Sequence, residues 1–220
     1  MEDGAPFVFG KIAEAANFTN RKEEIDLLKS NFFNNIHTVL ISPRRWGKSS
    51  LVAKAAAEAI KENRKLRVCF IDMQNIRTEK EFYSYFASEL IRSTSTKTEE
   101  LVEAARLFLS RFIPKLSMGI DPQNDFSLSL DWEEVKKSPD DVLNLSERIA
   151  KEKKLHLLIC IDEFQNVSEF KEGLAFQRKL RSHWQKHQMT TYCIYGSKRH
   201  MMMDVFTSPS MPFYKFGSLL

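Results

Sequence analysis

Residues 37–50 read HTVLISPRRWGKSS. The first six residues are a short β-branched, apolar run of the kind that forms a buried strand. After Lys48 the chain continues as SSLVAKAAAEAIKENRK, an alanine-rich pattern typical of a helix. A strand that passes through a tight turn into a helix presents main-chain N–H groups and the helix dipole to anionic oxygens. We therefore expect this segment to bind phosphate groups.

Each residue type in this loop has a chemical reason to be there. Gly47 allows close approach of the backbone, Lys48 offers a point charge to the β and γ phosphates, and the hydroxyl of Ser49 holds Mg²⁺. Ser42 stands where the pattern normally has its first glycine. Pro43 favours extended geometry at Ser42. Because the glycine nearest the phosphates, Gly47, is kept, we expect the loop still to close, although an ordinary strand-to-helix turn remains the alternative. The residues expected to contact a nucleotide are Pro43, Arg44, Arg45, Trp46, Gly47, Lys48, Ser49 and Ser50.

The second half of the site is expected at the end of the strand LHLLICIDEF, residues 155–164. Two successive carboxylates inside a buried strand would be costly, so Asp162 and Glu163 are expected at its carboxyl end, where open α/β sheets bind ligands. There Asp162 would hold Mg²⁺ and Glu163 would act as general base toward a water molecule. The simpler alternative is that both residues begin a surface loop.

A third polar residue follows the strand TTYCIYGS, residues 190–197. Ser197 ends this strand and could hydrogen-bond the γ-phosphate or the attacking water. Serine after glycine is also ordinary turn chemistry, so both interpretations stay open.

The wider pattern alternates strands and helices, which predicts a parallel, doubly wound α/β sheet of five strands. A change to alternating apolar residues over 116–132, around the turn DPQND, predicts an inserted β-hairpin. Capping boxes are expected at Asn20 with Glu23 and at Thr78 with Glu81. The expected strands are 37–42, 67–73, 155–164, 190–197 and 213–217. The expected helices begin near residues 21, 49, 79, 98, 139, 170 and 198.

Composition indicates one domain with a real core. The chain has 220 residues, 43% hydrophobic and 28% charged, and a net charge of +4 that permits an anionic partner without requiring one. It contains no apolar run of about 18 residues, so we expect no transmembrane helix and no membrane partner. The first residues do not resemble a secretory signal, which predicts a cytoplasmic protein. Cys69, Cys160 and Cys193 lie in apolar runs and are expected to be buried rather than metal ligands.

Taken together, these motifs resemble the AAA+ and STAND-type P-loop ATPases, in particular the archaeal-type predicted ATPase family that is also common in Bacteroidetes. The strongest motifs are Gly47-Lys48-Ser49 and Asp162-Glu163, and the likeness covers nearly the whole chain. NFTNRKEE, residues 17–24, resembles the family's motif ahead of the first core strand, with Asn20 in place of glycine and Arg21 as the arginine.

The resemblance implies an ATP hydrolase that uses ATP and Mg²⁺. It implies that Arg21 borders the adenine and ribose, with Phe7, Val8 and Phe9 near the base. It also implies that the loop strand lies between the last strand and the strand ending in Ser197. Family members continue into a helical lid that we do not find in residues 1–220, so we expect hydrolysis to need that lid or a partner.

Two other functions remain open: a nucleotide-gated switch or scaffold with little turnover, and a DNA-handling motor subunit. Protein partners or self-association are expected, and nucleic acid is a possible partner. The basic helix RKLRSHWQKH, residues 178–187, either contacts nucleic acid or packs Leu180 and Trp184 inward. Arg44 and Arg45 either contact phosphate or a neighbouring subunit, or are solvated. Lys198, Arg199 and His200 could sense phosphate or act in trans as an arginine finger.

Overall fold

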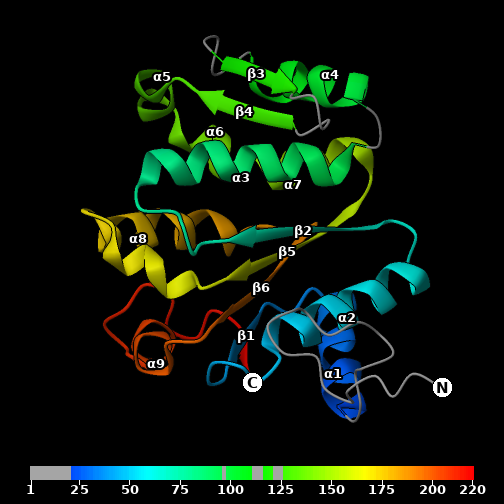
Figure 1. Ribbon diagram of the computed structural model, residues 1–220, viewed down its shortest axis with the longest axis vertical. Helices are drawn as coiled ribbons and strands as arrows, with labels where there is room; N and C mark the ends of the chain where they lie inside the picture. The colour runs from blue at the N-terminus through cyan, green and yellow to red at the C-terminus, as the bar shows by residue number, and fades with distance from the viewer. Residues whose placement is uncertain (1–20, 96–97, 111–115, 121–125) are drawn as a thin grey trace, which may run out of the picture.

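The computed structural model describes residues 21–95, 98–110, 116–120 and 126–220, and its centre is one parallel β-sheet (Figure 1). Five strands lie in the order β2-β5-β6-β1-β7, and all neighbouring pairs are parallel. The loop strand β1 therefore lies between β6 and the last strand, which confirms the expected order. The strands are β1 (Thr38–Ile41), β2 (Leu66–Asp72), β5 (His156–Asp162), β6 (Thr190–Gly196) and β7 (Ser218–Leu219).

Helices cover both faces of this sheet (Figure 1). On one face α1 (Lys22–Phe33) and α2 (Lys48–Glu62) bury their apolar side chains with Leu158 and Cys160 of β5. On the other face α3 (Glu79–Thr94) and α8 (Gly173–Trp184) pack against Ile159 of the same strand. Strand β5 is therefore covered on both faces, which explains its continuous apolar sequence. The other helices are α4 (Thr98–Leu109), α5 (Trp132–Lys137), α6 (Pro139–Leu143), α7 (Leu145–Lys153), the 3₁₀ helix η2 (Phe164–Glu169) and α9 (Arg199–Thr207).

The predicted hairpin forms an outer layer on α3. Strands β3 (Leu116–Ile120) and β4 (Phe126–Leu130) pair antiparallel, and β4 alternates between buried and exposed residues. The Nη2 atom of Arg92 on α3 donates to the carbonyl of Phe126 (2.7 Å), and the N–H of Leu130 donates to Ser84 Oγ (3.2 Å). The hairpin is thus anchored to the body of the domain at both ends of β4.

Several helices and strands begin or end at other residues than the sequence predicted. Strand β4 ends at Leu130, and Trp132 begins helix α5 because the side chain of Asp131 accepts the N–H of Glu134 (3.1 Å) and caps a new helix. The helix expected from residue 139 breaks at Asn144, whose Oδ1 contacts both His183 and His187. The capping box of Thr78 and Glu81 is confirmed. Helix α1 has Arg21 as its N-cap, and the expected cap Asn20 lies outside the described residues.

The last strand was predicted at the wrong residues. FYKFG, residues 213–217, forms turns, with Lys215 in the left-handed region (φ 52°) and the N–H of Phe216 donating to the carbonyl of Phe213 (3.0 Å). Phe213 and Phe216 are both buried, which a turn can achieve as well as a strand. The pairing strand is the short β7 that follows, which runs alongside β1.

Two half-buried histidines, His37 and His187, lie against the core, and desolvation keeps them neutral. Burial lowers the pKa of His37 and of His187 to about 4, with nearby Arg181 lowering the former further and Glu147 opposing the shift at the latter. The hydroxyl of Tyr192 lies 2.9 Å from Nδ1 of His187, and the N–H of Tyr192 donates to Nδ1 of His37 (3.3 Å). Protonating either ring would place a charge in the aromatic core beside β6.

We expect these histidines to make the domain less stable in mild acid. Unfolded histidine has a pKa of about 6.5, so between pH 6.5 and 4 the unfolded state binds more protons and stability falls as pH falls. Each ring accounts for about 2–3 kcal/mol across that window. Urea unfolding at pH 7 and pH 5 measures this, and His187→Asn should reduce the difference between the two pH values. An unchanged difference would contradict this origin.

Candidate nucleotide-binding site

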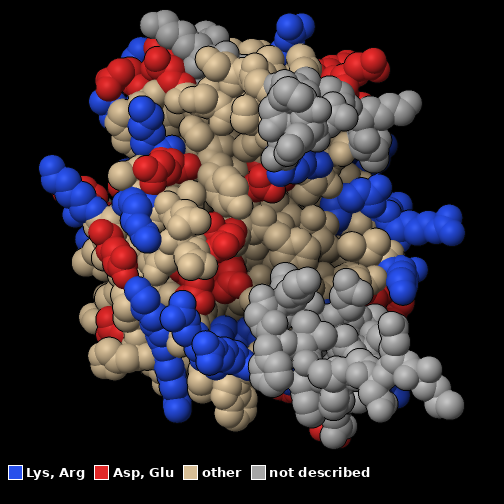
Figure 2. All heavy atoms as spheres, in the orientation of Figure 1, with Lys and Arg blue, Asp and Glu red and all other residues tan. Residues whose placement is uncertain are grey.

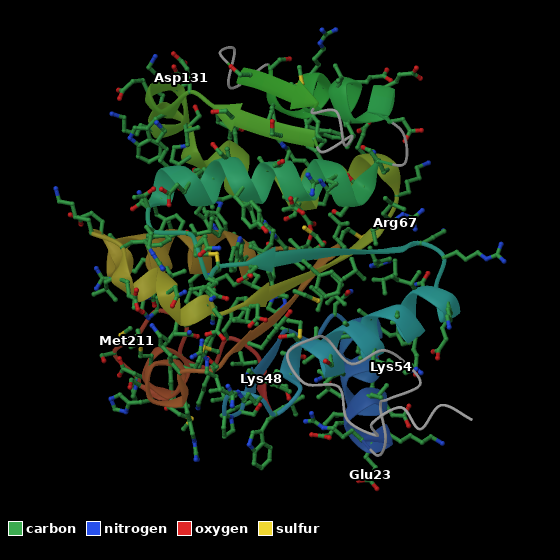
Figure 3. The ribbon with its side chains drawn as sticks, viewed as in Figure 1. Glu23, Lys48, Lys54, Arg67, Asp131 and Met211 are labelled. Atoms are coloured by element: carbon green, nitrogen blue, oxygen red, sulfur yellow. The ribbon has the colours of Figure 1, made fainter. Side chains whose placement is uncertain are left out.

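The glycine-lysine loop joins the end of β1 to the start of α2 and holds Lys48 inside the domain (Figure 3). The Lys48 side chain is buried, and its Nζ donates to the carbonyls of Ser42 (3.0 Å) and Pro43 (3.1 Å). The loop therefore wraps around its own ammonium group. Gly47 is the N-cap of α2, so the first N–H groups of that helix have no acceptors within the helix and face the same loop.

The substitution of serine for the first loop glycine does not strain the backbone. The backbone of Ser42 does not have a positive φ, whereas Arg45 (φ 65°) and Gly47 (φ 68°) occupy the left-handed region. The conformational freedom of glycine is therefore needed at Gly47 and not at position 42. Arg45 adopts this conformation at some cost, as strained loop residues near functional sites often do.

The predicted acid of β5 meets the predicted hydroxyl of α2. Ser49 Oγ donates to Asp162 Oδ2 (2.7 Å) across 113 residues of sequence. Oxygen ligands of this kind suit Mg²⁺, which usually takes one or two protein carboxylates together with waters and phosphate oxygens. Among the described residues no group of three or more His, Cys, Asp or Glu side chains could hold a metal ion. Ser49 and Asp162 place a hydroxyl oxygen and a carboxylate oxygen side by side at the start of α2 and the end of β5.

Glu163 and Ser197 also meet, at the ends of β5 and β6. The Oε2 atom of Glu163 accepts the N–H (3.3 Å) and the hydroxyl (3.1 Å) of Ser197, and the amide of Gln165 donates to the same oxygen. Glu163 is itself in the left-handed region (φ 52°), and its N–H donates to Asp162 Oδ1 (2.8 Å). The two strand ends are therefore linked through one carboxylate oxygen.

Burial and charge act on the three ionisable groups of the site. Burial raises the pKa of Asp162, the hydrogen bond from Ser49 opposes this, and the charge of Glu163 adds to it. Burial also disfavours the Glu163 carboxylate, but the hydrogen bonds from Gln165 and Ser197 and the charge of Lys48 outweigh it and lower its pKa. Burial lowers the pKa of Lys48, which both acids oppose. The site therefore keeps Glu163 ionised beside a partly desolvated ammonium.

A cavity of about 350 Å³ opens beside these strand ends. It is lined by Glu163 and Ser197 together with Arg44, Gln74, Arg77, Asn166, Glu169 and Lys198. Lys198 is paired with Glu169 (2.7 Å). Lys and Arg side chains gather at the same side of the molecule, where α9 lies (Figure 2).

The remaining predicted residues lie around the loop. Arg21 Nη1 donates to the carbonyl of Trp46 (2.9 Å), and the Arg21 guanidinium also forms an ion pair with Glu24, so the start of α1 is tied to the loop. Trp46 is 66% exposed, and Pro43, Arg44 and Arg45 are exposed as well. Ser50 is buried in the first turn of α2. Phe7, Val8 and Phe9 lie outside the described residues.

The chain is similar to known proteins only at the level of three-dimensional structure. No protein-family model matches the chain, and no curated protein matches it. Among solved structures it is similar to a Walker-type ATPase of Pyrococcus abyssi, with 20% identity and a TM-score of 0.60 over 97% of this chain and 56% of that one. The ORC2 protein of Aeropyrum pernix, solved as ADPNP-ADP complexes, gives 14% identity and a TM-score of 0.58 over 98% of this chain and 50% of that one. The Cdc6 protein of Pyrobaculum aerophilum gives 16% identity and a TM-score of 0.54 over 99% of this chain and 49% of that one.

The chain has the fold of these solved proteins, a P-loop NTPase fold with a five-stranded parallel sheet. It spans about half the length of the solved proteins that it matches. Among the residues that the structure describes, this P-loop fold includes no helix of the length and apolarity needed to cross a membrane.

Sequence reasoning missed several residues in or beside the cavity, among them Gln165 and Arg77. Gln165 lies two residues after Glu163 in IDEFQN and is fully buried, and Arg77 reaches the cavity from the loop between β2 and α3. The position of Gln165 two residues after an acidic pair could have indicated that it lies near the site. Nothing in the sequence around Arg77 indicated its position beside the cavity. The alternative of inward packing for the basic helix is confirmed, because Leu180 and Trp184 are fully buried.

Proposed function

We propose that this domain binds Mg-ATP at the carboxyl edge of its sheet and hydrolyses it, as the core of an AAA+/STAND-type ATPase. The observation that carries the proposal is the meeting of Ser49 with Asp162 (2.7 Å) next to the loop that encloses Lys48. The solved ADPNP-ADP complexes of the ORC2 protein, which shares the fold, support a nucleotide as ligand.

Each residue then has one task. Lys48 and the N–H groups at the start of α2 bind the β and γ phosphates, for which Lys48 exchanges its contacts to Ser42 and Pro43. Ser49 and Asp162 would hold Mg²⁺, which supplies charge neutralisation at the phosphates when bound. Arg21 and the exposed loop residues border the nucleotide.

Glu163 takes the proton of the attacking water. Its Oε1 atom has no hydrogen-bond partner among the described residues, and the Glu163 side chain lines the cavity beside the loop. A lowered pKa keeps this carboxylate ionised at neutral pH, so it is available to accept a proton. Ser197, bonded to the other oxygen, would also contact the terminal phosphate.

A nucleotide-gated switch with little turnover is the second candidate. It is favoured by the self-contacts of the site: Lys48 is engaged by loop carbonyls and Glu163 by Ser197 and Gln165. Binding a nucleotide must rearrange these contacts, which offers two states for a partner protein to distinguish. A role on DNA is supported only by a protein of similar structure, the ORC1 protein of Aeropyrum pernix, which was solved in complex with DNA.

The test of the proposal is magnesium-dependent stabilisation by ATP. At a concentration of ATP about 100 times its dissociation constant, binding should stabilise the fold by about 2.7 kcal/mol, seen as a rise in unfolding temperature. EDTA should reduce this rise, and Asp162→Asn should make the protein insensitive to EDTA.

The matched control for this test is Asp72→Asn. Asp72 pairs in register with Asp162 on the neighbouring strand, so its substitution removes the same charge from the same edge of the sheet. The Asp72 carboxylate accepts the N–H of Gln74 (2.8 Å) and does not contact Ser49. Asp72→Asn should keep the response to magnesium. A wild-type protein whose unfolding temperature does not change with ATP would refute the proposed function.

A further inference from the structure

Gln165 is a buried amide that spans the ends of two strands. Its side chain is fully buried, its Nε2 donates to Glu163 Oε2, and its Oε1 lies against Gly196 at the end of β6. A Cβ atom at Gly196 would lie 2.0 Å from Gln165 Oε1, so only glycine leaves room for this amide.

One oxygen of Glu163 is held by three donors from two segments. Gln165 holds it from η2, and the N–H and hydroxyl of Ser197 hold it from β6 (3.3 and 3.1 Å). Holding one carboxylate oxygen in place restricts rotation of the Glu163 side chain. The other oxygen therefore keeps a fixed direction. Glu163, Asn166 and Ser197 all line the cavity of about 350 Å³.

Packing alone does not account for the amide. Gln165 Oε1 is buried without a hydrogen-bond partner among the described residues, and leaving a buried acceptor unpaired costs about 1–3 kcal/mol. A methionine has nearly the same length and would fill the space without that cost. The polar end group therefore needs another explanation, and its contact with Glu163 supplies one.

We propose that Gln165 is a positioning residue for Glu163, holding the carboxylate on Ser197 so that its free oxygen addresses the water that attacks the terminal phosphate. The inference rests on the proposed function, because it assigns Glu163 as the base. Gln165 acts through Glu163 and touches neither water nor nucleotide. Displacing a reacting group by about 1 Å costs up to about 100-fold in rate, which sets the scale of the effect.

The test compares Gln165→Met with Gln177→Met. Gln177 is an equally buried glutamine on α8 whose Nε2 donates to Ser168 Oγ (3.1 Å) and whose Oε1 is also unpaired, but it does not line the cavity. Both variants should keep the fold. Gln165→Met should lower kcat about 10- to 100-fold and leave the dissociation constant for Mg-ATP within about twofold, whereas Gln177→Met should change neither. In a Glu163→Gln background, Gln165→Met should have no further effect on kcat.

A second measurement needs no turnover. Gln165→Met should shift the backbone amide resonance of Ser197 in the nucleotide-free protein, and Gln177→Met should not. A protein that binds ATP but never hydrolyses it would contradict the proposed hydrolysis, while the Ser197 resonance would still decide the role of Gln165. A raised kcat, equal effects of the two glutamine variants, or an unmoved Ser197 resonance would each overturn the inference.

Discussion

Lys48→Ala is expected to abolish the stabilisation of this domain by ATP. The ammonium is the charge that the loop encloses, and charge-assisted hydrogen bonds to phosphate are roughly twice as strong as neutral ones. Losing two or three of them at about 1.5–3 kcal/mol each weakens ATP binding by at least about 100-fold. The rise in unfolding temperature with ATP, which the wild-type protein should show, measures this loss.

The fold itself should survive this substitution. Lys48 is the first residue of α2, where alanine is a good helix former, and its removal also relieves the burial of a charge. Lys54→Ala is the control: it lies further along the same helix (Figure 3), and its ammonium contacts Glu58 at 3.5 Å on the surface. If Lys48→Ala and Lys54→Ala respond to ATP alike, the loop is not a phosphate site.

Many of the candidate site residues could be predicted from the sequence because parallel strands bring their carboxyl ends to one edge of the sheet. Once β1 and β5 are recognised as strands of one parallel sheet, Ser49 and Asp162 are expected at the same edge of that sheet, although 113 residues separate them. The order of the strands followed from the family resemblance and not from the residues themselves. What local patterning could supply was the position of polar residues directly after apolar runs.

Contacts between side chains from different strand ends could not be read in this way. The link from Gln165 through Glu163 to Ser197 depends on the left-handed backbone of Glu163 and on the space at Gly196, and neither has a periodic signal. FYKFG was misassigned for a related reason, because a turn packed against Trp184 and Arg181 of α8 buries Phe213 and Phe216 as well as a strand would.

Glu163→Gln is expected to separate binding from hydrolysis. Glutamine keeps an oxygen that can accept the N–H and hydroxyl of Ser197 and the amide of Gln165, so the local structure and the affinity for Mg-ATP should be retained. It cannot take a proton, and removing a general base costs about 10²- to 10⁴-fold in rate. Phosphate release under saturating Mg-ATP measures turnover, and isothermal titration measures binding.

Glu169→Gln provides the matched control for Glu163→Gln, because Glu169 lines the same cavity and its carboxylate is engaged by Lys198 (2.7 Å). This substitution also removes one negative charge from the cavity lining but takes away no base at the end of β5. If only Glu163→Gln loses turnover, the effect belongs to proton transfer and not to the charge of the cavity. Equal losses in both variants would assign the effect to electrostatics, and loss of ATP binding in Glu163→Gln would place the carboxylate in the nucleotide contact instead.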